Sequence, residues 1–173
     1  MTLVPFTPFH LGPALLFGLA LSVAFDLPTL LVASVIPDVE PFYVMYFHVS
    51  DYPLHGFFHS YIGSSILAVL VALVIYPLKN QLNKIMVNFR ISQKSSFKKI
   101  LFTSFVGVYF HVFLDSFLYE EMSPFYPLQG NPFINLLVAY GKYSVIYGFC
   151  SITALLGIIL YFYKIRKGVA VLG

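Results

Sequence analysis

The segment YFHVFLDS at residues 109–116 places a histidine and a carboxylate inside an otherwise apolar run. His111 and Asp115 are four residues apart, so on a helix their side chains share one face and lie about 6 Å apart along the axis. In a helix that crosses a bilayer such ionisable groups are energetically costly, and for that reason they usually mark a functional site. The pair therefore predicts a site for which the rest of the chain supplies partners.

Further ionisable side chains precede this pair in the sequence: His10, Asp38, Glu40, His55 and His59. His55 and His59 are again four residues apart, and we expect them on one face of a helix that begins at His55. Imidazole nitrogens and carboxylate oxygens together suit zinc, manganese or iron(II) better than calcium, magnesium or copper. The candidates outnumber the ligands of one tetrahedral ion, which predicts either two metal ions or one ion and a general base.

The composition is that of a membrane protein. Of the 173 residues, 59% are hydrophobic and 10% are charged, whereas an average soluble domain is about one quarter charged. Runs at residues 55–78, 100–119 and 143–163 are long enough to cross about 30 Å of hydrocarbon. Residues 9–25 and 27–36 form shorter apolar runs, and the second either enters the membrane part-way or continues past Pro37 toward Phe47. We predict one all-α transmembrane domain, residues 1–173, with about five apolar helical segments, the second short or re-entrant.

The basic residues indicate how the chain is oriented. Residues 79–99 hold six lysines and arginines and no acid, so the positive-inside rule predicts a cytoplasmic loop. The basic tail at residues 164–167 agrees, and by alternation the N-terminus is outside, residues 120–141 are an extracytoplasmic loop and the C-terminus is cytoplasmic. All the candidate ligands then fall in the outer half of the membrane. The positive charge is explained by topology, so we expect membrane lipids and no nucleic acid as partners.

Four elements follow one another in an order that resembles a known family: His10, PDVE at residues 37–40, HGFFHS at 55–60 and HVFLDS at 111–116. The family is that of bacterial and archaeal membrane-bound, inner-membrane metal-dependent hydrolases. More distantly, the order is similar to the ligand pattern of zinc-dependent phospholipase C. The chain lacks the family's arginine between His55 and Gly56, and Glu40 stands where the family has a second aspartate. The resemblance implies metal binding and hydrolysis.

These observations predict a membrane-embedded metal-dependent hydrolase that cleaves an ester or phosphoester of a lipid-like substrate from the outer half of the bilayer. Zinc is the first choice of metal and manganese or iron the next, with one or two ions bound. The expected metal ligands are His10, Asp38, His55, His59, His111 and Asp115. Glu40 and Asp38 are the candidate catalytic residues, with Glu40 as general base toward a water acidified by the metal. Lys142, at the outer end of the last helix, would hold an anionic head group.

Other functions use the same residues. A divalent metal transporter would carry its ion through these ligands, although no inverted repeat is evident. A haem protein would use facing histidines such as His59 and His111 as axial ligands. A metal-binding membrane protein without turnover would keep the ligands for structure or for a partner. The turn-rich residues 120–141 form either a lid over the site or a packed re-entrant segment, and the oligomeric state stays open.

Overall fold

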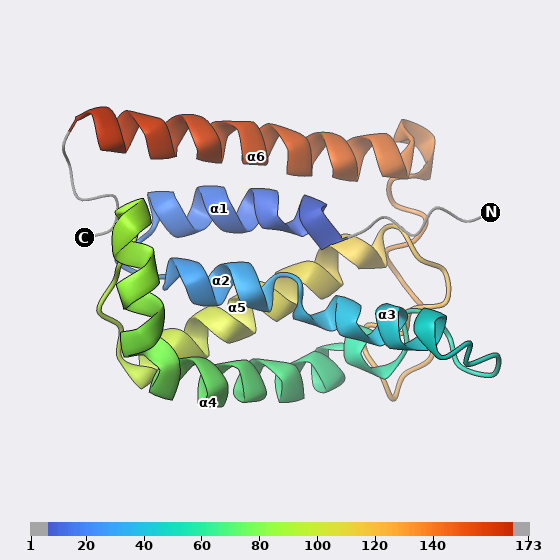
Figure 1. Cartoon of the computed structure of the whole chain (residues 1–173). Coiled ribbons are helices and arrows are strands. Elements are labelled where there is room, and N and C mark those ends of the chain that lie inside the picture. The colour runs from blue at the N-terminus through green and yellow to red at the C-terminus, as the bar shows by residue number, and fades with distance from the viewer. Residues whose placement is uncertain (1–6, 168–173) are drawn as a thin grey trace.

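The computed structural model describes residues 7–167, and every regular element among them is helical, as predicted (Figure 1). The α-helices are α1 (Leu11–Ala20), α2 (Leu27–Ala33), α3 (Val39–Tyr46), α4 (Tyr61–Met86), α5 (Phe97–Ser116) and α6 (Lys142–Arg166). Short 3-10 turns are η1 (Thr7–His10), η2 (Ile36–Asp38), η3 (Phe57–His59), η4 (Val87–Phe89) and η5 (Val138–Tyr140). Within the described residues, 4 helical stretches are long and apolar enough to cross a membrane, and Pro8–Ala20 is a shorter apolar helix.

The second apolar segment continues past Pro37 and does not stop there. The helices α2 and α3 follow each other through η2 to form one stretch of 20 residues, Leu27–Tyr46, which is long enough to span. Pro37 lies in the first turn of η2, where a missing backbone N–H removes no helical hydrogen bond. The proline therefore interrupts this stretch without ending it, and Asp38 lies at the join.

The helix expected to begin at His55 begins instead at Tyr61, so the prediction that His55 and His59 share a helical face is wrong. Ser60 is the N-cap of α4: its backbone is extended and its hydroxyl accepts a hydrogen bond from the N–H of Gly63 at 3.0 Å. The hydrogen bond of such a cap determines the first residue of the helix, even where the apolar run begins earlier in the sequence. His59 ends the short turn η3, and its position depends on that turn.

The basic segment at residues 79–99 is only partly a loop. The helix α4 runs on to Met86 and α5 begins at Phe97, after an N-cap at Ser96 whose hydroxyl accepts from the N–H of Lys99 at 3.3 Å. Lys79 is buried within α4 and forms an ion pair with Asp26. Residues 117–141 connect α5 to α6 through turns and η5. Which side of the membrane each connection faces stays a prediction.

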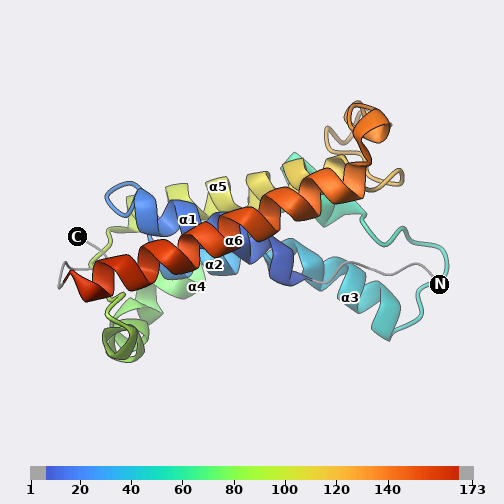
Figure 2. The ribbon, with the colours of Figure 1, turned by 90° about the horizontal axis from the view of Figure 1, so that it is seen from above.

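The helices pack as two pairs around α2. Figure 1 and Figure 2 show α6 lying along α1 on one side of the bundle, while α4 lies along α5 on the other. Close approach depends on small residues, as is common between membrane helices. A Cβ on Gly107 of α5 would lie 2.5 Å from the Cβ of Ala33, and one on Gly12 would lie 2.2 Å from the carbonyl oxygen of Cys150. The α2–α5 contact brings the end of α2 against the middle of α5.

A buried polar network that the sequence did not predict fastens the other end of α2. Asp26 caps this helix, since its carboxylate accepts from the N–H of Thr29 at 3.2 Å and from its hydroxyl at 2.5 Å. The same carboxylate accepts from the Lys79 ammonium and from the Ser95 hydroxyl, the latter at 2.6 Å. Gln93 accepts from the N–H of Leu27 at 3.1 Å. The network ties α2, α4 and the segment before α5 together.

The contact between α2 and α5 can be tested with a single methyl group. We expect Gly107→Ala to destabilise the protein by about 1–3 kcal/mol, because the added Cβ overpacks against Ala33. Gly148→Ala in α6 is the matched control, since no heavy atom lies within 4 Å of its Cβ position and alanine favours the helix. Thermal unfolding in maltoside micelles, followed by circular dichroism, would show a lower midpoint only for Gly107→Ala. Equal midpoints would contradict the close packing.

Candidate metal centre

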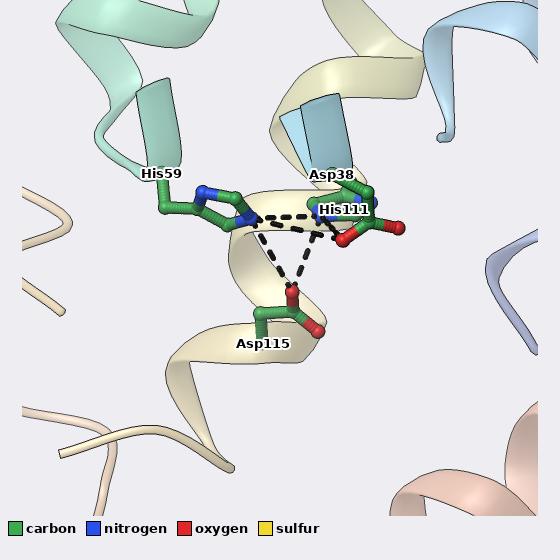
Figure 3. A group of neighbouring side chains, drawn as sticks. All are labelled: Asp38, His59, His111 and Asp115. Atoms are coloured by element: carbon green, nitrogen blue, oxygen red, sulfur yellow. Dashed lines mark hydrogen bonds and ion pairs between the residues drawn. The ribbon is translucent and has the colours of Figure 1, made fainter. Parts of the chain in front are cut away.

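Four side chains converge between the joined helices α2–α3, the turn η3 and the last turns of α5 (Figure 3). They are Asp38, His59, His111 and Asp115, and each offers one ligand atom within 4.8 Å of the other three. His111 and Asp115 share the inner face of α5, Asp38 ends η2, and His59 ends η3. Segments far apart in the sequence thus supply a group of nitrogen and oxygen ligands that could hold a metal ion.

The two histidines present lone pairs to each other. Nδ1 of His111 lies 2.8 Å from the carbonyl oxygen of Ser34, and Nδ1 of His59 lies 2.8 Å from a carboxylate oxygen of Glu40. Because these oxygens accept hydrogen bonds, each Nδ1 carries a proton, and in the neutral form of each ring Nε2 has a lone pair. The two Nε2 atoms are 3.3 Å apart. Two buried acceptors at that distance repel one another, and a metal ion or a proton shared between them relieves this repulsion.

The carboxylates complete an arrangement with the size of a metal site. Oδ2 of Asp115 is 3.1 Å from Nε2 of His111 and 3.7 Å from Nε2 of His59. Oδ1 of Asp38 is 3.6 Å and 3.9 Å from the same two nitrogens. Tetrahedral ligands bound at about 2.1 Å lie about 3.4 Å from one another. The residues present therefore fit a tetrahedral ion, whereas a single added proton would serve only one of these contacts.

The four ligands differ in their access to solvent. The side chains of His59 and His111 are 0% exposed and that of Asp115 is 3% exposed, while that of Asp38 is 15% exposed. The second carboxylate oxygen of Asp38, Oδ2, is buried and has no hydrogen-bond partner. Asp38 is also the ligand with the longest distances to both histidines. The group is therefore closed on three sides and accessible at Asp38.

Glu40, expected to act as general base, lies behind His59. One carboxylate oxygen receives hydrogen bonds from Nδ1 of His59 at 2.8 Å and from the N–H of Gly56 at 3.0 Å. The other receives them from the hydroxyl of Tyr52 at 2.7 Å and from the N–H of Phe58 at 3.0 Å. With both oxygens engaged, Glu40 orients His59, which is how carboxylates commonly support histidine ligands.

His10 reaches the group only through Asp115. Its Nε2 lies 3.1 Å from Oδ1 of Asp115, the oxygen that does not face His59, and its ring lies 4.0 Å from that of His111. Nδ1 of His10 is buried without a partner. His10 thus steadies the carboxylate of Asp115 in the manner of an outer hydrogen-bond partner of a metal ligand. Its predicted role as a direct ligand, or as a ligand of a second ion, stays a prediction.

His55 and Lys142 are engaged elsewhere. Nδ1 of His55 lies 2.8 Å from a carboxylate oxygen of Glu121, and its ring stacks on Tyr119 at 3.6 Å. The hydrogen bond from His55 lowers the pKa of the Glu121 carboxyl from its ordinary value. Lys142 donates to the carbonyl oxygen of Leu118 at 2.9 Å, just beyond the end of α5. The metal role predicted for His55 and the substrate role predicted for Lys142 stay predictions.

Two residues at the site were missed from the sequence. Tyr52 bridges the site, because its hydroxyl donates to Glu40 and accepts from the N–H of Phe57 at 2.8 Å. Glu121 holds His55. Both lie in irregular segments, where no periodic spacing relates a residue to the ligands, so no sequence signal pointed to them.

The comparisons with known proteins identify a family. A family model described as YdjM inner membrane protein matches residues 5–172 of the chain. None of the curated proteins and none of the solved structures compared with the chain matches it. The match covers nearly the whole chain, including every ligand of the candidate metal centre, and it supports a multi-pass protein of the inner membrane.

A single group of four ligands within residues 7–167 predicts one metal ion per protein chain. We expect about one equivalent of zinc, manganese or iron in protein purified in maltoside, and its loss from the double variant His111→Ala, Asp115→Ala, which removes two of the four ligands. His48→Asn is the matched control, because His48 is exposed and has a φ of 51° that asparagine tolerates. Elemental analysis by mass spectrometry measures the content. Equal metal in the wild type and the double variant would contradict the site.

The support of His59 by Glu40 can be measured separately. Glu40→Gln keeps the size of the side chain but weakens the hold on Nδ1 of His59, so we expect metal affinity to fall about 10–100-fold. Glu120→Gln makes the same chemical change at an exposed carboxylate outside the ligand group, and it is the control. Competition with a chromophoric chelator reports both dissociation constants. An unchanged constant in Glu40→Gln would show that His59 does not need this partner.

Proposed function

The chain belongs to the YdjM inner membrane protein family, and we propose that it is a metal-dependent hydrolase that cleaves an ester or phosphoester bond of a lipid-like substrate. The observation that carries this proposal is the pair of facing Nε2 atoms, 3.3 Å apart, with two carboxylate oxygens around them. A mixed nitrogen and oxygen ligand set favours zinc, with manganese or iron as alternatives. When bound, such an ion supplies Lewis acidity toward the scissile group and toward water.

The protein's own residues would hold the ion and orient its ligands. His59 and His111 hold the ion through Nε2 while their Nδ1 protons are held by Glu40 and Ser34. Asp115 contributes Oδ2, and His10 fixes its other oxygen at 3.1 Å. Because each of these ligands is oriented by a partner outside the cluster, the group is preorganised and needs little rearrangement on binding.

Asp38 is the residue best suited to act on water. Its Oδ2 has no hydrogen-bond partner, and its side chain is the most exposed of the four. A carboxylate oxygen that is buried beside the ligand group and has no hydrogen-bond partner can accept the proton of an attacking water bound there. We therefore assign the role of general base to Asp38, whereas Glu40, whose oxygens are both engaged, positions His59.

A lipid-like substrate is supported by the surroundings of the site. The ligands lie within or beside helices long and apolar enough to cross a membrane. An apolar pocket of about 470 Å³ adjoins the site and is lined by Val39, Tyr43, Val44, Val49 and Phe58 beside Glu40 and Tyr52. Such a pocket accommodates an acyl chain that arrives from the bilayer. The orientation that puts the N-terminus outside and the C-terminus in the cytoplasm belongs to this proposal.

The alternative functions differ in how well the geometry supports them. The 3.3 Å between Nε2 of His59 and Nε2 of His111 is shorter than the roughly 4 Å between axial ligands that each bind iron at about 2.0 Å, which argues against haem. For transport, one metal-ligand group was found among residues 7–167, and the polar network at Asp26 pairs its charges internally. Four protein ligands are, however, also typical of structural zinc. Metal binding without turnover is therefore the second candidate function.

The substitution Asp38→Asn distinguishes a metal-dependent hydrolase from a protein that binds metal without turnover. Asp38→Asn keeps an oxygen for the metal but cannot accept a proton, so we expect metal to be retained while turnover falls about 10²–10⁴-fold. Hydrolysis of short-chain ester and phosphoester lipids in micelles, measured beside metal content on the same samples, tests this. Asp51→Asn, an exposed acid outside the cluster, should leave turnover unchanged. A metal-loaded wild type that hydrolyses none of these lipids would leave metal binding without turnover.

A further inference from the structure

A second pocket, polar where the first is apolar, lies on the other side of Tyr52. It has a volume of about 320 Å³, and its lining includes Tyr52, His55, Phe57, Glu121, Tyr126 and Gln129. Tyr52 lines both pockets and also donates to Glu40, the partner of His59. The ring of His55 lies 4.8 Å from that of His59. The polar pocket therefore shares Tyr52 with the apolar pocket, and its residue His55 contacts His59 of the metal centre.

The walls of the polar pocket combine aromatic rings with a carboxylate. Phe57 and Tyr126 meet edge to face at 5.7 Å. One oxygen of Glu121 accepts from His55 at 2.8 Å, and the Glu121 side chain is 38% exposed, so the carboxylate faces the pocket and solvent. Among residues 7–167, which the structure describes, no lysine or arginine lines the pocket. Aromatic faces and a carboxylate are the groups with which proteins bind ammonium cations.

The shape of this corner depends on Gly56. A Cβ at this position would lie 2.5 Å from two ring carbons and the hydroxyl oxygen of Tyr52, so the Tyr52 side chain lies directly against the glycine. The N–H of Gly56 donates to Glu40 at 3.0 Å. The wall between the two pockets and the support of His59 are thus built from the same few residues.

We propose that the polar pocket binds the ammonium group of a lipid head group, protonated primary or quaternary, while the acyl chain occupies the apolar pocket and the scissile bond lies at the metal centre. This inference rests on the proposed function and specifies its substrate class. It concerns the ammonium end of the head group only, and the expectation that Lys142 holds an anionic group stays a prediction.

Binding of short-chain lipids tests the inference without turnover. Metal-loaded protein in maltoside, an uncharged detergent, is titrated with dihexanoyl lipids that carry choline, ethanolamine or glycerol head groups, and dissociation constants are read by native mass spectrometry. We expect the two ammonium lipids to bind about tenfold more tightly than the glycerol lipid, and Glu121→Gln to remove this preference. Free phosphocholine, which lacks an acyl chain, should bind more weakly than the choline lipid.

Two further variants keep the outcome decisive. Glu120→Gln makes the same change in charge at the neighbouring exposed position and should keep the preference. Tyr126→Leu removes a ring that is 43% exposed, so the fold should tolerate it, and it should weaken only the ammonium lipids. If the wild type shows no preference, or if Glu121→Gln keeps it, the inference fails. If the protein hydrolyses lipids but binds all head groups equally, only this inference is overturned. If it binds ammonium lipids preferentially but hydrolyses none, only the proposed function is overturned.

Discussion

The structure depends on one electrostatic constraint, the meeting of two imidazole lone pairs and two carboxylates in a buried place. Water is largely excluded there, so acceptors without a donor repel one another strongly. Two groups outside the cluster hold the histidine rings in this orientation. The carbonyl oxygen of Ser34 accepts from Nδ1 of His111, and the carboxylate of Glu40 accepts from Nδ1 of His59. These hydrogen bonds thus orient both histidines as the proposed metal ion would need them.

The position of the four ligands depends on α2, which polar contacts hold to its neighbouring helices at both ends. At one end, Asp26 joins the buried Lys79 of α4, so the start of α2 is held to its neighbour. At the other end, Ser34 and Asp38 contact His111, and the packing of Ala33 on Gly107 lets the two helices approach closely. Long-range polar contacts thus hold the two ends of α2, and small residues let α2 and α5 approach closely.

Much of the fold and the centre of the site could be predicted from sequence. The apolar runs indicated the spans, and the spacing of His111 and Asp115 on one helix carried their geometry directly. The prediction failed where local hydrogen bonds outweigh hydrophobicity: the cap at Ser60 moves the start of α4 past His59. The roles of Glu40 and Glu121 depend on contacts between distant segments, which no local pattern encodes.

The origin of the ligands in separate segments has a consequence for biogenesis. Asp38 and His59 emerge from the ribosome well before His111 and Asp115, and neither early residue can form the centre alone. The ion can be captured with all four ligands only after α5 has been inserted beside α2 and α4. Until then the early helices must be held in the membrane by apolar contacts and by their own backbone hydrogen bonds. On the proposed function, metal loading would therefore be a late step in the maturation of this protein.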